Sequence, residues 1–180
     1  IDLRGVRVGY LPRLGNSVVE SETLNLVGSA VAALAEAGAI VEEVPDTFPS
    51  TLSIWGPLTF SIWAQRFGPH EATLGDRMSA SLRQWMAQGR AASALDVQAA
   101  MEARTTLFRH VQALFEQYDA LVTPTLACPA ISADHDPSGD LVIENRVAGG
   151  LRDGWYPYTH PFNLTGHPAL TVPAGWTRED

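Results

Sequence analysis

Cys128 and two histidines near the end of this 180-residue chain are the side chains that could do chemistry by themselves. Cys128, the only cysteine, could act as a thiol nucleophile with His160 or His167 as its base. A buried, inert cysteine is the alternative. The two histidines flank a turn, where they could line a pocket or be packed and hydrogen-bonded in the core. We keep both interpretations open at this point.

Motifs for phosphate and metal binding are absent from the sequence. It has no glycine-rich nucleotide loop and no histidine pair with zinc spacing. Residues 134–140 place oxygen-bearing side chains at the spacing of a calcium loop, but the last ligand position holds Asn145, and Glu144 is one place early. We therefore predict an exposed polar loop there, no metal and no cofactor.

The charged residues exclude several classes of function. All twelve basic residues are arginine, so no lysine chemistry can occur within the chain. The net charge of −8 makes nucleic acid and anionic membranes poor partners. No apolar run approaches 18 residues and no signal-peptide pattern is evident, so we expect a soluble, cytoplasmic protein.

Regular elements are predicted most clearly at the start and in the middle of the chain. Residues 6–11 and 40–44 resemble strands and enclose a helical pattern over 19–37, so they form a βαβ unit with parallel strands. A long amphipathic helix over 95–118 leads into a strand at 120–123. Within that helix, Arg104 occupies an apolar stripe. It should meet a carboxylate or carbonyls of another element, or else recognise a substrate carboxylate.

Other segments give weaker patterns. Residues from Leu52 to Ile62 have helical spacing that Gly56 and Pro57 should break or kink, and a helix from Met78 should end near Gly89. A short extended piece is expected at 141–143. Residues 158–176 should form a short helix stopped by Gly166 and then a buried strand at 169–172.

A pocket is expected at the carboxyl end of the strand over 120–123. In open α/β sheets, ligands bind outside the carboxyl ends of the strands. Nearby residues with hydroxyl or aromatic side chains are therefore the candidate substrate-binding wall: Thr123, Thr125, Trp155, Tyr156, Tyr158 and Phe162. The alternative is that they only cap the core. No residue of the chain is assigned a catalytic role.

The predicted fold class is α/β, with part of a mixed β-sheet covered by helices. The four expected strands are apolar without strict alternation, which is typical of a sheet covered on both faces. A sheet of this size would leave an apolar edge open. We therefore expect the chain to be incomplete as an isolated unit.

Three ordered blocks resemble the C-terminal half of the amidase signature family. They are residues 2–10 (DLRGVRVGY), 118–125 (YDALVTPT) and 162–175 (FNLTGHPALTVPAG). The resemblance implies a large mixed sheet covered by helices, and hydrolysis of carboxamides to carboxylate and ammonia or amine. It also implies a serine nucleophile activated by a lysine through a second, cis-peptide serine. None of these catalytic residues can be assigned here.

Residues 1–180 are accordingly expected to be a single C-terminal fragment of an amidase domain, inactive alone. Its partners would be the missing N-terminal half and a small amide substrate, and self-association stays open. The alternatives are a non-catalytic interaction module, a fragment of the amidase-like component of a glutamine amidotransferase, or a hydrolase built on Cys128. The segment at 155–161 favours a stand-alone amidase over the amidotransferase.

Overall fold

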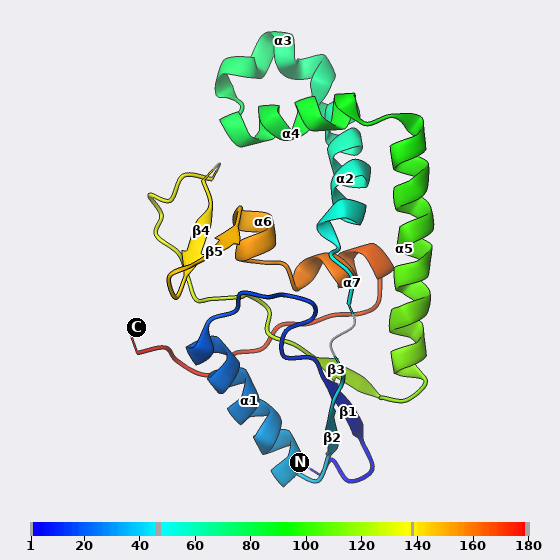
Figure 1. The fold of residues 1–180 in the computed structure, drawn as a ribbon, viewed down its shortest axis with the longest axis vertical. Helices are drawn as coiled ribbons and strands as arrows, with labels where there is room; N and C mark the ends of the chain where they lie inside the picture. The colour runs from blue at the N-terminus through cyan, green and yellow to red at the C-terminus, as the bar shows by residue number, and fades with distance from the viewer. Residues whose placement is uncertain (1, 46–47, 138, 179–180) are drawn as a thin grey trace.

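The computed structural model describes residues 2–45, 48–137 and 139–178 as an α/β protein (Figure 1). Short 3₁₀ turns at Gly68–His70 and Gly75–Arg77 flank a one-turn helix, α3 (Glu71–Leu74). The remaining elements are β1 (Arg7–Tyr10), α1 (Ser21–Glu36), β2 (Ile40–Glu43), α2 (Leu52–Phe67), α4 (Ala80–Ala91), α5 (Ala94–Phe115), β3 (Ala120–Val122), β4 (Leu141–Ile143), β5 (Arg146–Gly149), α6 (Leu151–Gly154) and α7 (Thr159–Thr165). The α/β class predicted from the sequence is confirmed.

The sheet has the strand order β2-β1-β3 and is parallel throughout. Val8 of β1 pairs with Val41 of β2 and with Ala120 of β3, so the predicted βαβ unit and the third strand are confirmed. Antiparallel pairing within the described residues is confined to the separate β4–β5 hairpin.

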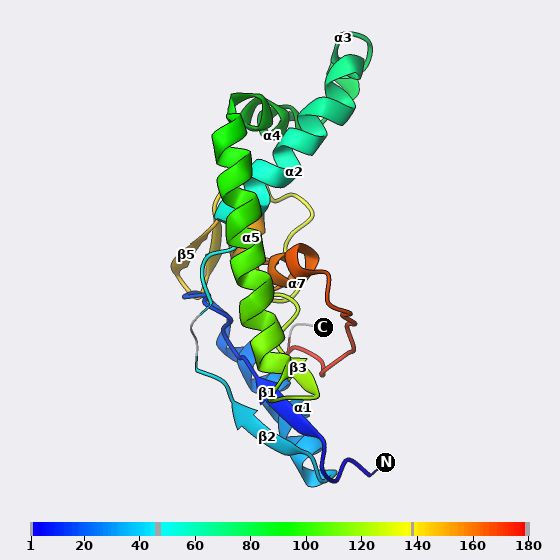
Figure 2. The ribbon, with the colours of Figure 1, turned by 90° about the vertical axis from the view of Figure 1, so that its right-hand side faces the viewer.

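Helices α1 and α5 cover the sheet. Figures 1 and 2 place α1 against one face and the C-terminal end of α5 near the other. Buried apolar side chains from the end of β1, from α5 and from the turn after α5 belong to one core cluster, including Leu11, Leu107, Val111 and Tyr118. The layered core thus continues from the sheet along the inner side of α5.

Helices α2, α3 and α4 form an arm that extends away from the sheet (Figure 2). Both helices expected in this arm are present. Helix α2 does not break at Pro57, and α4 ends at Ala91, near Gly89 as predicted. Gly89 itself is needed for packing, because a Cβ there would lie 2.0 Å from the carbonyl oxygen of Phe60. It allows α4 to cross α2 in close contact.

The hairpin β4–β5 is partly unexpected. The extended piece at 141–143 is confirmed as β4, whereas β5 was not predicted. The turn between them places Glu144 and Asn145 at positive φ of 49° and 61°. The Glu144 carboxylate accepts hydrogen bonds from the backbone N–H and the hydroxyl of Ser21, at 2.9 and 3.0 Å, which fixes the hairpin to the start of α1.

The C-terminal segment departs from its prediction. Helix α7 ends as expected at Gly166, whose φ of +73° is left-handed. Residues 169–172 form no strand, however, and Leu170 and Val172 are 83% and 66% exposed. A strand needs a neighbouring strand for its backbone hydrogen bonds, and no described strand pairs with this run. The predicted buried strand is therefore an exposed segment outside any helix or strand.

Among the described residues, no helix combines the length and the apolar character needed to cross a bilayer.

Candidate functional site

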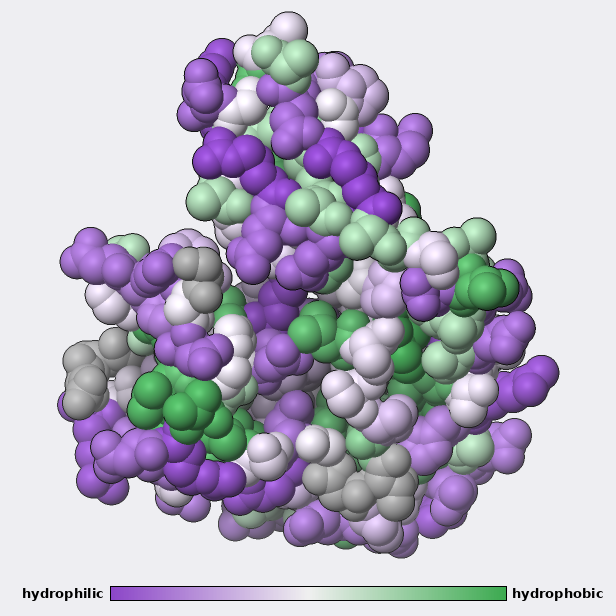
Figure 3. Space-filling model, turned by 45° about the horizontal axis from the view of Figure 1, so that its top comes forward, coloured by the Kyte–Doolittle hydropathy of each residue, from purple (hydrophilic) through white to green (hydrophobic). Residues whose placement is uncertain are grey.

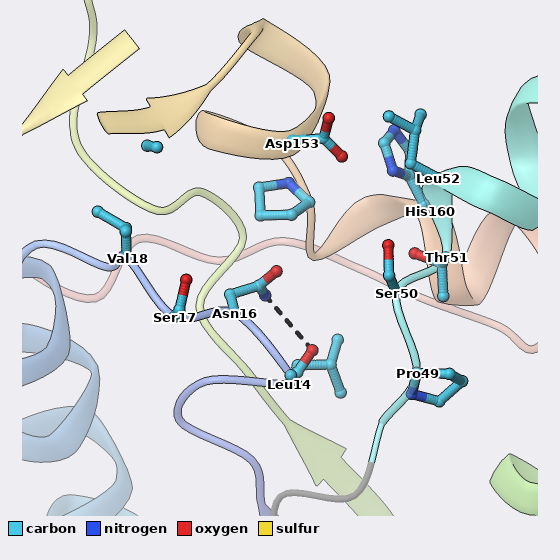
Figure 4. A pocket seen from close by; sticks show the side chains of 13 residues that line it. Leu14, Asn16, Ser17, Val18, Pro49, Ser50, Thr51, Leu52, Asp153 and His160 are labelled. Carbon is cyan, nitrogen blue, oxygen red and sulfur yellow. Dashed lines mark hydrogen bonds between the residues drawn. The ribbon is translucent and has the colours of Figure 1, made fainter. Parts of the chain in front are cut away.

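The candidate site is a cavity of about 190 Å³ between two loops (Figure 4). One loop, residues 14–18, follows β1, and the other, residues 49–52, follows β2. Ala148, Asp153, Pro157 and His160 complete the wall. The cavity therefore lies beyond the carboxyl ends of two parallel strands, where α/β sheets usually bind ligands. The sequence predicted a pocket after the strand over 120–123, whereas this cavity lies beyond β1 and β2.

Polar groups reach the cavity from both loops. In Figure 4, Asn16 and Ser17 approach from one side, while Ser50 and Thr51 approach from the other. Asn16 donates from Nδ2 to the carbonyl oxygen of Arg13 at 2.6 Å, which fixes the shape of its loop. Partial burial raises the pKa of the Asp153 carboxyl at the rim. These groups can donate or accept hydrogen bonds.

His160 forms the back of the cavity. It is 2% exposed, and its ring stacks on Trp55 with the centroids 5.0 Å apart. Burial, and then the positive charge of Arg152, lower the pKa of His160 to about 4. Its Nε2 has no hydrogen-bond partner in the part of the chain that the structure describes. The imidazole is therefore neutral at physiological pH and is a weak base.

The two threonines expected in the pocket wall lie elsewhere. Thr123 donates its hydroxyl to the carbonyl oxygen of Pro124 at 2.6 Å, and the hydroxyls of Thr125 and Thr171 are 3.3 Å apart. Neither residue lines the cavity. Their predicted contact with substrate stays a prediction.

The four aromatic residues of the predicted wall mostly pack in the core. Trp155 donates from Nε1 to the carbonyl oxygen of Pro129 at 3.0 Å. The fully buried Tyr158 donates its hydroxyl to the carbonyl oxygen of Pro12 at 2.8 Å. Phe162 packs against the core cluster. Tyr156 differs, because its ring meets the edge of His160, with centroids 6.0 Å apart. It therefore contacts a residue of the cavity wall.

Cys128 has the properties of an inert thiol. It is 8% exposed, and burial together with the Glu20 carboxylate raises its pKa to about 11. At neutral pH almost none of it is the reactive thiolate. His167, the second candidate base, lies 3.3 Å from Gln112 Oε1 and stacks on Phe108. The structure therefore disfavours a hydrolase built on Cys128.

Arg104 meets a carbonyl, in agreement with one of the predicted alternatives. Its Nε donates to the carbonyl oxygen of Leu164 at 2.6 Å and so links α5 to α7. The side chain is more exposed than its place on the apolar stripe suggested. No group of three or more His, Cys, Asp or Glu side chains within the described ranges could hold a metal ion.

Sequence reasoning missed most of the cavity. Asn16 and Ser17, and Ser50 and Thr51, are polar residues that closely follow two predicted strands. Their position after two parallel strands is the feature of the sequence from which this cavity could have been predicted. His160 was considered for a pocket, and it does line one.

Comparison with known proteins identifies the family. The family model for amidases matches residues 1–180. This chain belongs to the amidase family. The amidase-family chain is 29% identical over 187 residues to an acylamidase of Rhodococcus erythropolis, and 30% identical over 207 residues to a glutamyl-tRNA(Gln) amidotransferase component of Nocardia farcinica. These matches cover 99% of this chain but only 37% and 40% of the two relatives. The resemblance found in the three sequence blocks is thereby confirmed.

Solved structures give the same assignment. The chain superposes on a bacterial aryl acylamidase of the amidase signature family with a TM-score of 0.82 and 26% identity, covering 98% of this chain and 38% of that one. Superposition on the corresponding glutamyl-tRNA(Gln) amidotransferase component from Thermotoga maritima gives a TM-score of 0.59 at 24% identity, which supports the fold alone. The chain thus spans about two-fifths of these amidase relatives.

Proposed function

We propose that this chain is the C-terminal part of an amidase that hydrolyses carboxamides to a carboxylate and ammonia or an amine. The observation that supports this most directly is the amidase match over all 180 residues, together with the superposition on an aryl acylamidase at a TM-score of 0.82. A stand-alone amidase is preferred to a component of a glutamine amidotransferase because the segment at 155–161 looks more like the stand-alone enzymes.

In this proposal the chain supplies scaffold and pocket wall, and the catalytic residues lie in the remaining part of the protein. The serine–cis-serine–lysine mechanism needs a neutral lysine to take a proton through the bridging serine, and this chain contains no lysine. Preorganised N–H donors would then stabilise the tetrahedral oxyanion. The chain alone is accordingly expected to be inactive.

The remaining part of the protein would also cover exposed apolar side chains near the C-terminus. Leu170 and Trp176 are 83% and 86% exposed, although neither is part of an element. If these side chains form a contiguous apolar patch, it would mark a contact with another protein segment. The same exposure would serve a non-catalytic interaction module, which is the second candidate function. The cytoplasmic location stays a prediction, and so does the lack of nucleic-acid partners, which rests on the net charge of −8.

Assays of the purified chain separate these candidates. We expect no release of ammonia or amine from acetamide, benzamide or acetanilide above a blank purification. Activity that disappears in Cys128→Ser would instead support the cysteine hydrolase. Activity that persists in Cys128→Ser would contradict the proposal that the catalytic residues lie outside this chain.

A further inference from the structure

Arg152 of α6 is surrounded by aromatic rings from three other parts of the chain. Its guanidinium carbon lies 4.2 Å from the ring centroid of Trp85 in α4, and 4.6 and 5.1 Å from those of Trp55 and Trp63 in α2. Tyr156 is 5.7 Å away. Ring faces attract a cation at such distances, so they hold the guanidinium in place between the arm and α6.

The charge of Arg152 has no counter-ion among the described residues. Within that part of the chain no carboxylate lies at ion-pair distance, although the sequence has 20 acidic residues against 12 arginines. Burial lowers its pKa, and the charge effect opposing this comes from Tyr156. A partly buried cation without an anion is unfavourable unless something else neutralises it.

One hydrogen-bond donor of Arg152 also lacks an acceptor among the described residues. Its Nε–H is buried yet has no acceptor in the described part of the chain. Several other arginines are paired: Arg90 with Glu71, Arg7 with Glu42, and Arg104 with the Leu164 carbonyl. The aromatic rings attract the charge, but no group in the described part of the chain accepts a hydrogen bond from the Nε–H, and an unmet buried donor costs free energy.

This cluster adjoins the candidate cavity. His160 lines the cavity and stacks on Trp55, which in turn contacts Arg152. Figure 3 shows the surface hollowed between the helical arm and the rest of the molecule, with strongly hydrophilic and hydrophobic residues meeting there. Arg152 itself does not line the cavity and is joined to it through the rings of Trp55 and His160.

We propose that Arg152, held by Trp55, Trp63, Trp85 and Tyr156, is a binding site for the carboxylate of a small organic ligand. A carboxylate suits the unpaired donor, because its two oxygens can accept from Nε–H and one terminal N–H at once. It also supplies the missing negative charge. A neutral aryl ring would satisfy neither need, since it brings no negative charge and no strong hydrogen-bond acceptor.

If the protein is an amidase, as proposed above and as this step requires, a carboxylate site at Arg152 defines the class of amide that it hydrolyses. The amide substrate bears a carboxylate, as in an acylated aminobenzoate, and Arg152 positions it away from the bond that is cleaved. Arg152 would determine specificity without taking part in the chemical step.

Binding of benzoate and benzamide to the purified protein tests the site without any catalysis. The two probes share a ring and differ in charge. We expect benzoate to shift the Arg152 Nε–H resonance saturably in ¹H–¹⁵N NMR spectra and to bind at least tenfold more tightly than benzamide. Arg152→Met should remove that preference, whereas Arg83→Met, at an exposed arginine that donates to the carbonyls of Gly75 and Met78, should leave it unchanged.

Equal binding of the two probes, or no binding of benzoate to the folded wild-type protein, would overturn the proposal. This comparison does not depend on the folding of a variant. In the longer protein, hydrolysis of 4-acetamidobenzoate should be at least tenfold more efficient than that of acetanilide, and Arg152→Met should abolish the difference. If the longer protein hydrolyses neither amide while benzoate still binds at Arg152, the proposed function fails and the carboxylate site stands.

Discussion

Arg104 donates to a backbone carbonyl, whereas the Nε–H of Arg152 has no acceptor among the described residues. From the sequence, Arg104 is the arginine expected to be structural or to recognise a carboxylate. The structure shows the structural contact at Arg104 and an Nε–H without an acceptor at Arg152. Sequence spacing could not separate them, because the rings around Arg152 come from α2, α4 and the residues before α7.

Removing the Arg104 guanidinium should destabilise the junction of α5 and α7. Arg104→Met loses the 2.6 Å hydrogen bond to the Leu164 carbonyl, so we expect the free energy of unfolding to fall by about 1–2 kcal/mol. Urea unfolding followed by circular dichroism measures this. Arg109→Met, at an exposed position of the same helix, is the matched control and should change stability by less than about 0.5 kcal/mol. Equal effects of the two variants would contradict a structural role for Arg104.

The buried imidazole of His160 should make stability depend on pH. Its pKa is 6.5 in the unfolded chain and about 4 in the folded protein, so protonation favours unfolding. The contribution of neutral His160 to the free energy of unfolding is complete above about pH 6.5. It is lost progressively as pH falls toward 4, by about 3 kcal/mol in all.

Urea unfolding at several pH values in this range can isolate the His160 contribution. Carboxylates titrate in the same window, so the comparison is with His160→Gln, which retains them. The variant should lose less stability on acidification than the wild type. Parallel pH profiles would show that His160 is not responsible.

At the scale of elements, the crossing of α2 and α4 depends on Gly89, near which the sequence pattern predicts the end of a helix. A Cβ at position 89 would lie 2.0 Å from the Phe60 carbonyl oxygen and 2.3 Å from its carbon, so Gly89→Ala must separate the helices. We expect a loss of about 3 kcal/mol. Gly28→Ala, inside α1 with its nearest neighbour 4.0 Å away, is the control and should gain about 0.5–1 kcal/mol. Thermal unfolding that ranks the two variants the other way would refute this explanation of the crossing.

Elements with a strong local pattern could be predicted, and those that depend on distant neighbours could not. The apolar spacing of α5 and the apolar strands β1 and β3 are properties of their own residues. In contrast, β5 has the unpatterned sequence RVAG and exists because β4 pairs with it. The reverse holds at 169–172, where a strand-like sequence has no partner strand in the described chain. The cavity was missed for a related reason, because it forms where loops after two different strands meet.

At the scale of the whole molecule, the chain has a core but also exposes large apolar side chains. A layered core surrounds Leu107 and Val111, while Leu170, Val172 and Trp176 are all more than half exposed. This combination is what a part of a larger amidase would show, and the match to about two-fifths of each relative agrees with it. The pocket side chains would then be completed by residues from the remaining part of the protein.

The most direct test is amide hydrolysis by the chain extended through its upstream reading frame, assayed beside the 180-residue chain. We predict that the extended protein releases aromatic amine from acetanilide or 4-acetamidobenzoate, that the short chain does not, and that replacing an upstream lysine abolishes the activity. An extended protein that is folded and hydrolyses no amide, or whose activity needs no residue outside positions 1–180, would contradict the proposed function.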